Sequence, residues 1–224
     1  MNVVSEYNVI SGSWKLKDSQ KKTRQQRSFG KTRKKLMGAA KEVLAEKGIA
    51  AMTVEEITDR ADVGRGSFYY HFEAKDELIC QMIEKLLTEL IVAMRESCEP
   101  HNEINSVLDA MIGAHIKFFS KNWEDFVLFH QGSADLMLIE NLEGIETPFE
   151  EYLNCIEQLI AKAVSQPISK ERLQRLACAI AGFISGYYSF ASVATEDDDV
   201  DKWFISLRSA FVASLVRFIQ EAMP

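Results

Sequence analysis

The sequence predicts an all-α protein with a small N-terminal unit of three helices and a larger helical domain behind it. Apolar residues recur at helical spacing from Thr32 almost to the C-terminus, and no segment shows the alternation typical of a strand. Pro148 and Pro167 fall at the edges of predicted helices, where proline is tolerated. The 224 residues, 47% of them apolar, are sufficient for a sizeable buried core.

Charge is distributed unevenly along the chain. Residues 1–28 lack helical periodicity and are rich in Ser, Lys and Gln, so we expect a flexible basic arm there. Residues 1–75 carry a net charge of +6 and residues 76–224 one of −13. Residues 15–35 contain ten cations and one anion. This asymmetry favours a polyanion-binding N-terminal unit on an acidic body, the alternative for the arm being a merely solvated tail.

Two helices are predicted before residue 62. The first begins at Thr32 and ends at Gly48, because glycine commonly follows the last helical turn. The second is about eight residues long, with Thr53 as its N-cap and Glu56 completing a capping box, and it ends near Asp62. One face of the first helix is apolar and comprises Leu36, Ala39, Ala40, Val43 and Leu44.

The stretch DVGRGSFYYHF, residues 62–72, predicts a tight turn and a short third helix, which together with the second form a helix-turn-helix unit. Asp62 tolerates the positive φ that such a turn often requires. Gly64 and Gly66 allow the backbone to approach a phosphate or a base edge, and Arg65 between them could bind the O6/N7 edge of guanine. Phe68 and Phe72 are expected to face the core and Tyr70 and His71 to face outward, while Ser67 and Tyr69 offer hydroxyls to phosphates.

Residues 32–78, TRKKLMGAAKEVLAEKGIAAMTVEEITDRADVGRGSFYYHFEAKDEL, resemble the N-terminal DNA-binding domain of the tetracycline-repressor (TetR) family. The motifs AEKG, TVEEI, GSFYYHF and KDEL occur in the order and at the spacing found in that family. The resemblance implies an all-helical homodimer whose second domain binds small molecules and shifts the spacing of two DNA-reading units. The chain departs from the family pattern at four positions, Ile49, Thr58, Asp62 and Gly64, and Gly64 leaves the third helix without the usual serine cap.

The resemblance also assigns DNA-binding residues. It places Thr53, Ser67, Tyr69 and Lys75 at phosphate-contacting positions and Arg65, Gly66, Tyr70 and His71 at groove-facing ones. Arg33, with Lys31, is expected to touch the DNA backbone at the start of the first helix. The alternatives are packing for Tyr69, an ordinary helix-start cation for Lys75 and a buried, hydrogen-bonded side chain for His71. The arm could also follow the minor groove.

The C-terminal domain, residues 76–224, is expected to bind a ligand and to dimerise. Its long first helix runs from Lys75 to about Cys98, and further helices are predicted near 103–121, 122–131, 147–166, 169–194 and 198–222. Aromatic and histidine side chains could line a largely hydrophobic pocket, with plain core as the alternative for each residue. These ligand-binding candidates are His115, Phe119, Trp123, Phe126, His130, Tyr152, Phe183 and Tyr187.

Residues 176–195 carry no charge over 20 positions. Their small residues favour a buried helix or a subunit interface over a membrane span. The last two helices of each subunit, paired about a two-fold axis, would form a four-helix bundle, the alternative being an intrachain core. The predicted interface residues are Gly182, Gly186, Trp203, Leu207, Phe211, Leu215 and Phe218.

The sequence contains no motif typical of a secreted protein, a metal-binding protein or an enzyme. The four cysteines, Cys80, Cys98, Cys155 and Cys178, form no CxxC pair, so we expect free thiols in a reducing cytoplasm. The N-terminus lacks the pattern of a signal peptide. No HExxH, GxSxG, P-loop or dinucleotide motif is present, and we therefore expect no enzyme activity, no metal and no cofactor.

These observations predict a ligand-responsive transcriptional regulator, and specifically a repressor. Its homodimer would bind a pseudo-palindromic double-stranded DNA operator and be released by a small, mostly apolar effector. The alternative is an inducer-independent factor of the same fold that binds many chromosomal sites in a structural or cell-division role. A ligand-binding protein whose DNA function has decayed is a further alternative, and the intact third helix argues against it.

Overall fold

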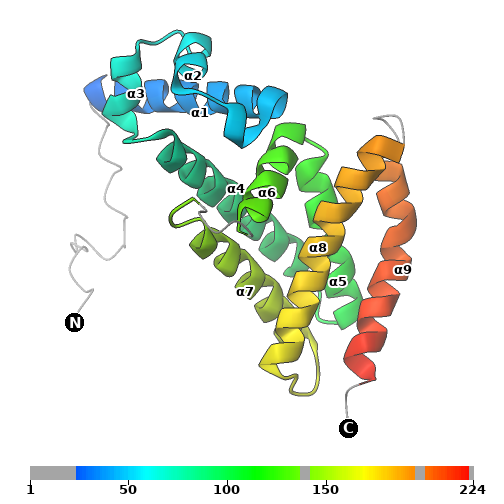
Figure 1. Cartoon of the computed structure of the whole chain (residues 1–224). Helices are drawn as coiled ribbons and strands as arrows, with labels where there is room; N and C mark the ends of the chain where they lie inside the picture. Colours follow the sequence, from blue (N-terminus) through cyan, green and yellow to red (C-terminus); the bar gives the residue numbers. More distant parts are fainter. Residues whose placement is uncertain (1–23, 137–141, 195–199, 222–224) are drawn as a thin grey trace, which may run out of the picture.

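The structure is a computed structural model that describes residues 24–136, 142–194 and 200–221. These residues form helices and no strands, which confirms the predicted all-α class. The first three helices, α1 (Arg24–Ala51), α2 (Val54–Arg60) and α3 (Arg65–His71), form a unit that we call the head. Figure 1 shows the head lying across one end of the remaining helices, which we call the body.

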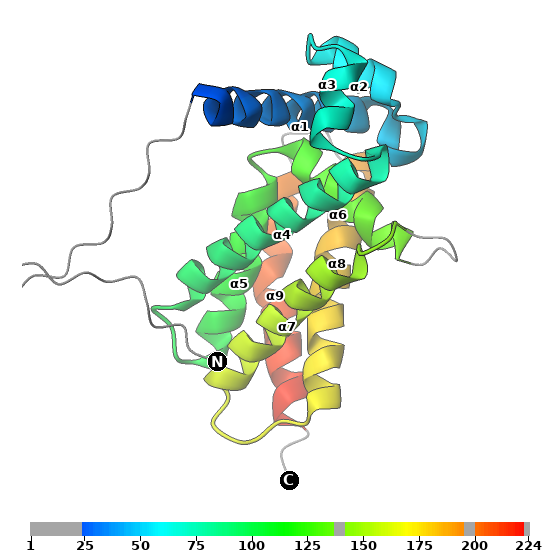
Figure 2. The same ribbon diagram turned by 90° about the vertical axis from the view of Figure 1, so that its left-hand side faces the viewer.

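The body begins with α4 (Lys75–Cys98), which runs from the head along the other helices. It continues with α5 (Ile104–Phe119), α6 (Trp123–Asp135), α7 (Glu146–Ala163), α8 (Lys170–Ala194) and α9 (Val200–Gln220). Helix α4 packs against α5, α6 and α7, while α8 and α9 lie side by side, at one edge of the body in Figure 1 and behind the other helices in Figure 2. Each predicted body helix is present, with ends within four residues of the predicted ones.

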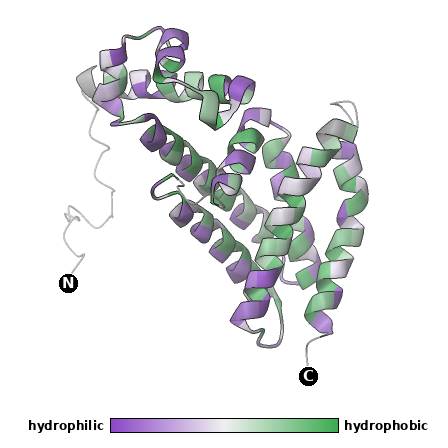
Figure 3. Ribbon diagram, in the orientation of Figure 1, coloured by the Kyte–Doolittle hydropathy of each residue, from purple (hydrophilic) through white to green (hydrophobic). Residues whose placement is uncertain are grey.

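The body is held together by the apolar faces of amphipathic helices. In Figure 3 the hydrophilic residues of α4 and α7 follow one side of each helix and the hydrophobic residues the other. The buried face of α4 recurs every three or four positions, as a helix packed on one side requires. It consists of Leu78, Ile79, Met82, Ile83, Leu86, Leu87, Leu90, Met94 and Cys98. No helix among the described residues is long and apolar enough to cross a membrane.

The start of α1 differs from the sequence-based prediction. The helix begins at Arg24, eight residues before the predicted start at Thr32, so residues 24–28 of the predicted arm are helical. The remainder of the predicted arm, residues 1–23, lies outside the described residues. At the other end Gly48 has φ 79° and ψ 171°, which breaks the regular helix where its end is predicted, and one further turn reaches Ala51. The predicted apolar face of α1 is buried in the core.

Candidate DNA-binding interface and helical body

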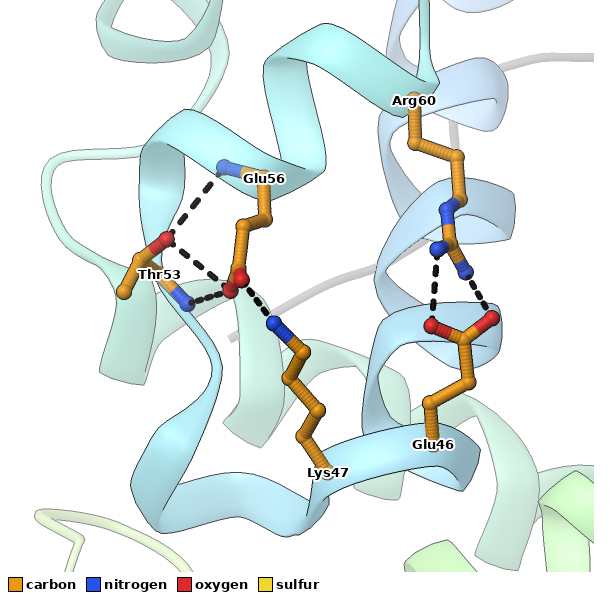
Figure 4. A network of polar contacts seen from close by, with 5 residues as sticks. All are labelled: Glu46, Lys47, Thr53, Glu56 and Arg60. Atoms are coloured by element: carbon orange, nitrogen blue, oxygen red, sulfur yellow. Dashed lines mark hydrogen bonds and ion pairs between the residues drawn. The ribbon is translucent and has the colours of Figure 1, made fainter.

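The start of α2 is fixed by a reciprocal capping box. The Glu56 backbone N–H donates to Thr53 Oγ1 at 3.3 Å, and the Thr53 N–H donates to Glu56 Oε2 at 3.2 Å (Figure 4). The Lys47 ammonium pairs with the same carboxylate, and this contact together with the Thr53 hydrogen bonds lowers the pKa of Glu56. Thr53 therefore lies at its predicted N-cap, where its exposed hydroxyl belongs to a network that ties α2 to α1.

A second contact joins the same two helices. The Arg60 guanidinium donates two hydrogen bonds to the carboxylate oxygens of Glu46, at 2.6 and 2.7 Å (Figure 4). This bidentate pair lowers the pKa of Glu46, and its planar geometry restricts how α2 can rotate on α1. The capping box and this ion pair therefore both orient α2 on α1 ahead of the turn that follows α2.

The turn between α2 and α3 has the predicted geometry. Asp62 has φ 52°, the left-handed value expected at this position, and its N–H donates to Asp59 O at 3.1 Å. Gly64 is the N-cap of α3, and no side chain caps the helix there. The first cation of α3, Arg65, pairs with Glu55 of α2 at 2.5 Å, and both side chains remain largely exposed.

Helix α3 has one buried side and one open side. Phe68 and Phe72 are 0% and 1% exposed, which confirms that they anchor the helix in the core. On the opposite side Arg65 and Gly66 are exposed, and Tyr69 and Tyr70 are 60% and 69% exposed. Ser67 is half-buried beside them. The structure thus brings five predicted DNA-binding residues together on one short helix, with cationic, hydroxyl and bare-backbone groups available to a ligand.

His71 occupies a different environment from Tyr70. Its imidazole is half-buried beneath the ring of Phe29 from α1, with ring centroids 4.2 Å apart. Burial, and then the nearby Arg33 charge, lower the pKa of His71, so the ring is neutral at neutral pH. Its Nδ1 is buried and has no hydrogen-bond partner among the described residues. The predicted outward orientation of His71 therefore does not describe its position, and the sequence pattern gave no indication of Phe29.

Two predicted phosphate contacts are engaged within the protein. The Arg33 guanidinium lies 5.1 Å from the centre of the Phe72 ring and donates to Gln81 on α4. The Lys75 ammonium donates to the backbone carbonyl of Ile49 at 3.1 Å. Both side chains are half-buried and connect α1 to the start of α4, and their predicted contacts with phosphate stay predictions. Lys31, Lys34 and Lys35 of α1 are exposed cations.

Helix α6 of the body forms polar contacts with α1. Gln131 Oε1 accepts the backbone N–H of Ile49 at 2.7 Å, directly after the kink at Gly48. Lys41 forms an ion pair with Asp125, whose carboxylate is almost fully buried. A buried carboxylate requires such a partner, because an isolated charge away from water is costly. Helix α6 therefore joins α4 in attaching the head to the body by polar contacts.

Among the predicted ligand-binding residues, His115 and Tyr152 form a buried pair. His115 Nδ1 lies 2.8 Å from the Met111 carbonyl oxygen, which can only accept, so Nδ1 carries the proton. Nε2 then accepts the Tyr152 hydroxyl at 2.9 Å. Burial lowers the pKa of His115 to about 4 and raises that of Tyr152. Both side chains thus serve as a neutral link between α5 and α7.

The other ligand-binding candidates are divided between two places. Phe119 and Phe126 are buried together, with ring centroids 5.6 Å apart, and His130 stacks on Phe126 and contacts the Ser185 hydroxyl at 2.8 Å. Trp123 lies at the edge of this cluster and is 46% exposed. Phe183 and Tyr187 instead line a cavity of about 450 Å³ on α8 and α9. The structure therefore does not bring all eight candidates into one pocket.

The body also contains a groove that the sequence did not indicate. It has a volume of about 1120 Å³ and lies between α4, α5 and α9. Arg208 of α9 donates to Asp109 of α5 in this groove, and the Arg208 guanidinium lies directly over Gly113. A Cβ at Gly113 would approach that guanidinium to 2.8 Å, so the absence of a side chain at this position leaves room for Arg208. The mixture of charges in the groove contrasts with the apolar pocket that was predicted.

The predicted dimer residues lie on α8 and α9, and most reach the surface. Trp203, Leu207 and Phe218 are 47%, 46% and 37% exposed, and apolar side chains gathered on one exposed face can mark an interaction site. Gly182 is exposed, and Gly186 and Phe211 are half-buried. Leu215 is an exception, because it is buried inside the subunit. Phe190, which was not predicted, is 78% exposed and lines the same cavity as Gly182, Gly186 and Trp203.

Known proteins resemble this chain in sequence and fold. Residues 36–82 match the family described as "Bacterial regulatory proteins, tetR family". The uncharacterized HTH-type transcriptional regulator YvdT of Bacillus subtilis is 28% identical over 131 residues, 58% of this chain and 66% of YvdT. The HTH-type transcriptional repressor KstR2 of Rhodococcus jostii is 30% identical over 122 residues, 53% of this chain and 60% of KstR2. The aligned part of this chain therefore spans less than two thirds of either relative.

Solved structures share the fold over most of the chain. The transcriptional regulator FadR of Bacillus subtilis, solved in complex with stearoyl-CoA, has a TM-score of 0.69 and 17% identity, covering 82% of this chain and 97% of FadR. A TerR/AcrR-family transcriptional regulator of Aquifex aeolicus has a TM-score of 0.61 and 22% identity, covering 80% and 97%. With the helix-turn-helix geometry of α2 and α3, these findings show that residues 36–82 form a helix-turn-helix domain of the kind found in bacterial regulatory proteins of the tetR family, on a helical fold shared with the solved regulators.

Proposed function

We propose that the chain acts as a homodimeric repressor that binds a pseudo-palindromic operator and is released by a small, mostly apolar effector. The observation that carries the DNA-binding part is the open side of α3. Arg65, Gly66, Tyr69 and Tyr70 are exposed there on a helix whose other side is locked into the core. A helix presented in this way after a tight turn fits the major groove, where side chains can reach base edges.

The outer face of α8 and α9 supports the proposed dimerisation. The exposed Trp203, Leu207 and Phe190 make this face more apolar than a solvated helix pair requires. A second copy, related by a two-fold axis, would cover it and form a four-helix bundle. Two α3 helices would then be available to successive major grooves about 34–36 Å apart.

The effector proposal rests on the body. Its buried aromatic residues offer an apolar environment, and the FadR structure with the same fold contains stearoyl-CoA. A putative fatty acid metabolism regulator of Clostridium perfringens also shares the fold, with a TM-score of 0.63 and 22% identity. We place the effector beside Phe126 and His130, because these residues lie on α6, the helix that holds Ile49 of the head. An effector that moved α6 would move the head with it, which is the linkage that release requires.

A matched pair of glycine variants tests the DNA-binding proposal. A duplex is first enriched by the wild-type protein from a random-sequence pool. Gly66→Asp places a negative charge on the open side of α3, and Gly38→Asp places the same charge on an exposed position of α1, with nothing within 4 Å of either Cβ. We expect Gly66→Asp to abolish binding to the duplex in a gel shift and Gly38→Asp to retain it. Equal binding by both variants would contradict the use of α3.

The effector and the sign of regulation need separate measurements. Stearoyl-CoA and acyl-CoAs of shorter chain length are titrated into the protein–duplex complex. We expect the longer acyl chains to release the protein from the duplex more effectively than the shorter ones. A reporter gene behind the enriched duplex should rise in expression when the protein is removed. The relative FasR of Mycolicibacterium smegmatis, 27% identical over 99 residues, is named as an activator, so a fall in expression would correct the sign without affecting DNA binding.

The alternative is a chromosome-binding factor with a structural role. A genome-wide map of bound sites separates the two functions. A few sites near promoters support the repressor, whereas many dispersed sites unaffected by any acyl-CoA support the structural factor.

A further inference from the structure

Helix α1 extends beyond the part of the chain that matches the TetR family. The helix begins at Arg24, whereas the family match begins at residue 36. The extension therefore adds about three helical turns to the head. Its aromatic residue, Phe29, is 40% exposed, and its ring points toward the recognition helix α3 rather than into the core of the head.

Three rings from these two helices form a small cluster on the surface. The Phe29 ring centre lies 4.2 Å from that of His71 and 5.6 Å from that of Tyr70, the latter in an edge-to-face arrangement. Tyr70 and His71 are also in edge-to-face contact, at 5.5 Å. Edge-to-face and offset arrangements are the favourable geometries for aromatic pairs, because the positive ring edge meets the negative face. The cluster is thus a directional contact and not only a covering of apolar surface.

Apart from the exposed ion pair of Arg65 with Glu55, helix α3 has few other restraints on its open side. It contains seven residues, which is too short for a helix to be stable by itself. Gly64 gives it no side-chain cap, so one source of local stability is absent. Phe68 and Phe72 fix the helix from the core side only. The contact from Phe29 therefore restrains the opposite side, where Tyr70 would otherwise be free to change its rotamer.

We propose that Phe29 is a positioning residue for DNA recognition, which holds His71 and Tyr70 so that the open side of α3 is presented in one orientation. The inference rests on the proposed DNA-binding function. Phe29 itself acts through the ring of Tyr70, which is 69% exposed and available to DNA. Loss of Phe29 should therefore weaken discrimination between DNA sequences more than it weakens general attraction to phosphates.

Three variants test this inference. Phe29→Ala removes the ring, Phe29→Tyr retains it, and Gly30→Ala changes the neighbouring residue where a Cβ meets nothing within 4 Å. Each protein is titrated with the duplex enriched by the wild type and with a scrambled duplex of the same composition. We expect Phe29→Ala to reduce the ratio of the two affinities roughly two- to tenfold, the effect of losing one aromatic pair. Phe29→Tyr should restore the ratio, and Gly30→Ala should leave it unchanged or raise it.

The Gly30→Ala control tests whether a change in the helix content of the extension explains the effect. Gly30→Ala and Phe29→Ala both increase the helical propensity of the extension, so an effect caused only by helix content would shift the two variants in the same direction from the wild type. A loss of discrimination in Phe29→Ala alone therefore reports the loss of the ring. An unchanged ratio in Phe29→Ala overturns the inference, as does a ratio that Phe29→Tyr fails to restore.

A second readout needs no DNA. Burial under Phe29 contributes to the lowered pKa of His71, so the pKa followed by NMR of the imidazole should rise in Phe29→Ala and remain low in Phe29→Tyr. An identical titration in all three proteins shows that the ring contact is absent and overturns the inference. If the wild type enriches no duplex, the proposed function fails and the recognition role fails with it, while the titration still reports whether the rings meet.

Discussion

The buried pair of His115 and Tyr152 allows a quantitative prediction about stability and pH. In the folded protein the pKa of His115 is about 4, because burial disfavours its charged form, whereas the ordinary value is 6.5. Between these two pH values the unfolded chain binds a proton that the folded protein does not. The stability is therefore fully present above pH 6.5 and is lost as the pH falls toward 4, by roughly 3 kcal/mol.

Two variants separate the titration from the hydrogen bond. Tyr152→Phe leaves His115 Nε2 buried without a donor and should cost about 1–3 kcal/mol at pH 7. The double variant His115→Leu/Tyr152→Phe removes both polar partners, so it should be less destabilised than the loss of two separate interactions implies. Its free energy of unfolding should also not show the decrease between pH 6.5 and 4 that the titration of His115 causes in the wild type.

The measurement is urea-induced unfolding at fixed protein concentration from pH 4 to 8. The free energy of unfolding of each variant is subtracted from that of the wild type at every pH, which removes contributions from other titrating groups. His101→Gln, at an exposed position, serves as the control for a histidine replacement. If the double variant retains the wild-type dependence on pH, His115 is not the neutral, buried base that the geometry describes.

Three further predictions concern the head and the dimer. Arg65→Ala should relax sequence preference at one base pair and cost about 1–3 kcal/mol of binding free energy if the guanidinium reads guanine, and an equal loss on every duplex would exclude base reading. Thr53→Ala removes the capping box of α2 and should lower the free energy of unfolding by about 1 kcal/mol in chemical denaturation, while an unchanged value would show that Glu56 and Lys47 suffice. Leu207→Glu should give monomers in analytical ultracentrifugation and abolish tight binding to DNA, and a stable dimer would place the interface elsewhere.

Much of the fold could be predicted because the helices of this chain are strongly amphipathic. Apolar spacing, the Thr53 cap and the turn at Asp62 located α2, α3 and the body helices to within a few residues. The start of α1 was missed because residues 24–31 have no apolar periodicity. That segment contacts α3 through Phe29, and a single aromatic residue gives no periodic signal.

The candidate sites were predicted less completely. The open side of α3 followed from local spacing, since Phe68 and Phe72 define its buried side. The internal roles of Arg33 and Lys75 depend on Gln81 and Ile49, which are distant in sequence and become neighbours only in the folded head. Aromatic residues of the body could not be divided between the core and the α8–α9 face, because helical periodicity shows that a side is apolar but not what covers it.

The peptide unit of Ile49 joins three parts of the molecule. Its N–H is held by Gln131 of α6 and its carbonyl by Lys75 at the start of α4, next to the left-handed Gly48. Because both groups belong to the main chain, replacing the Ile49 side chain leaves these hydrogen bonds in place. A chimera that joins residues 24–74 to the body of another protein would therefore contain the Ile49 peptide unit without its two hydrogen-bond partners. It would need a glutamine and a lysine supplied at matching positions before the grafted domain could sit at the same angle.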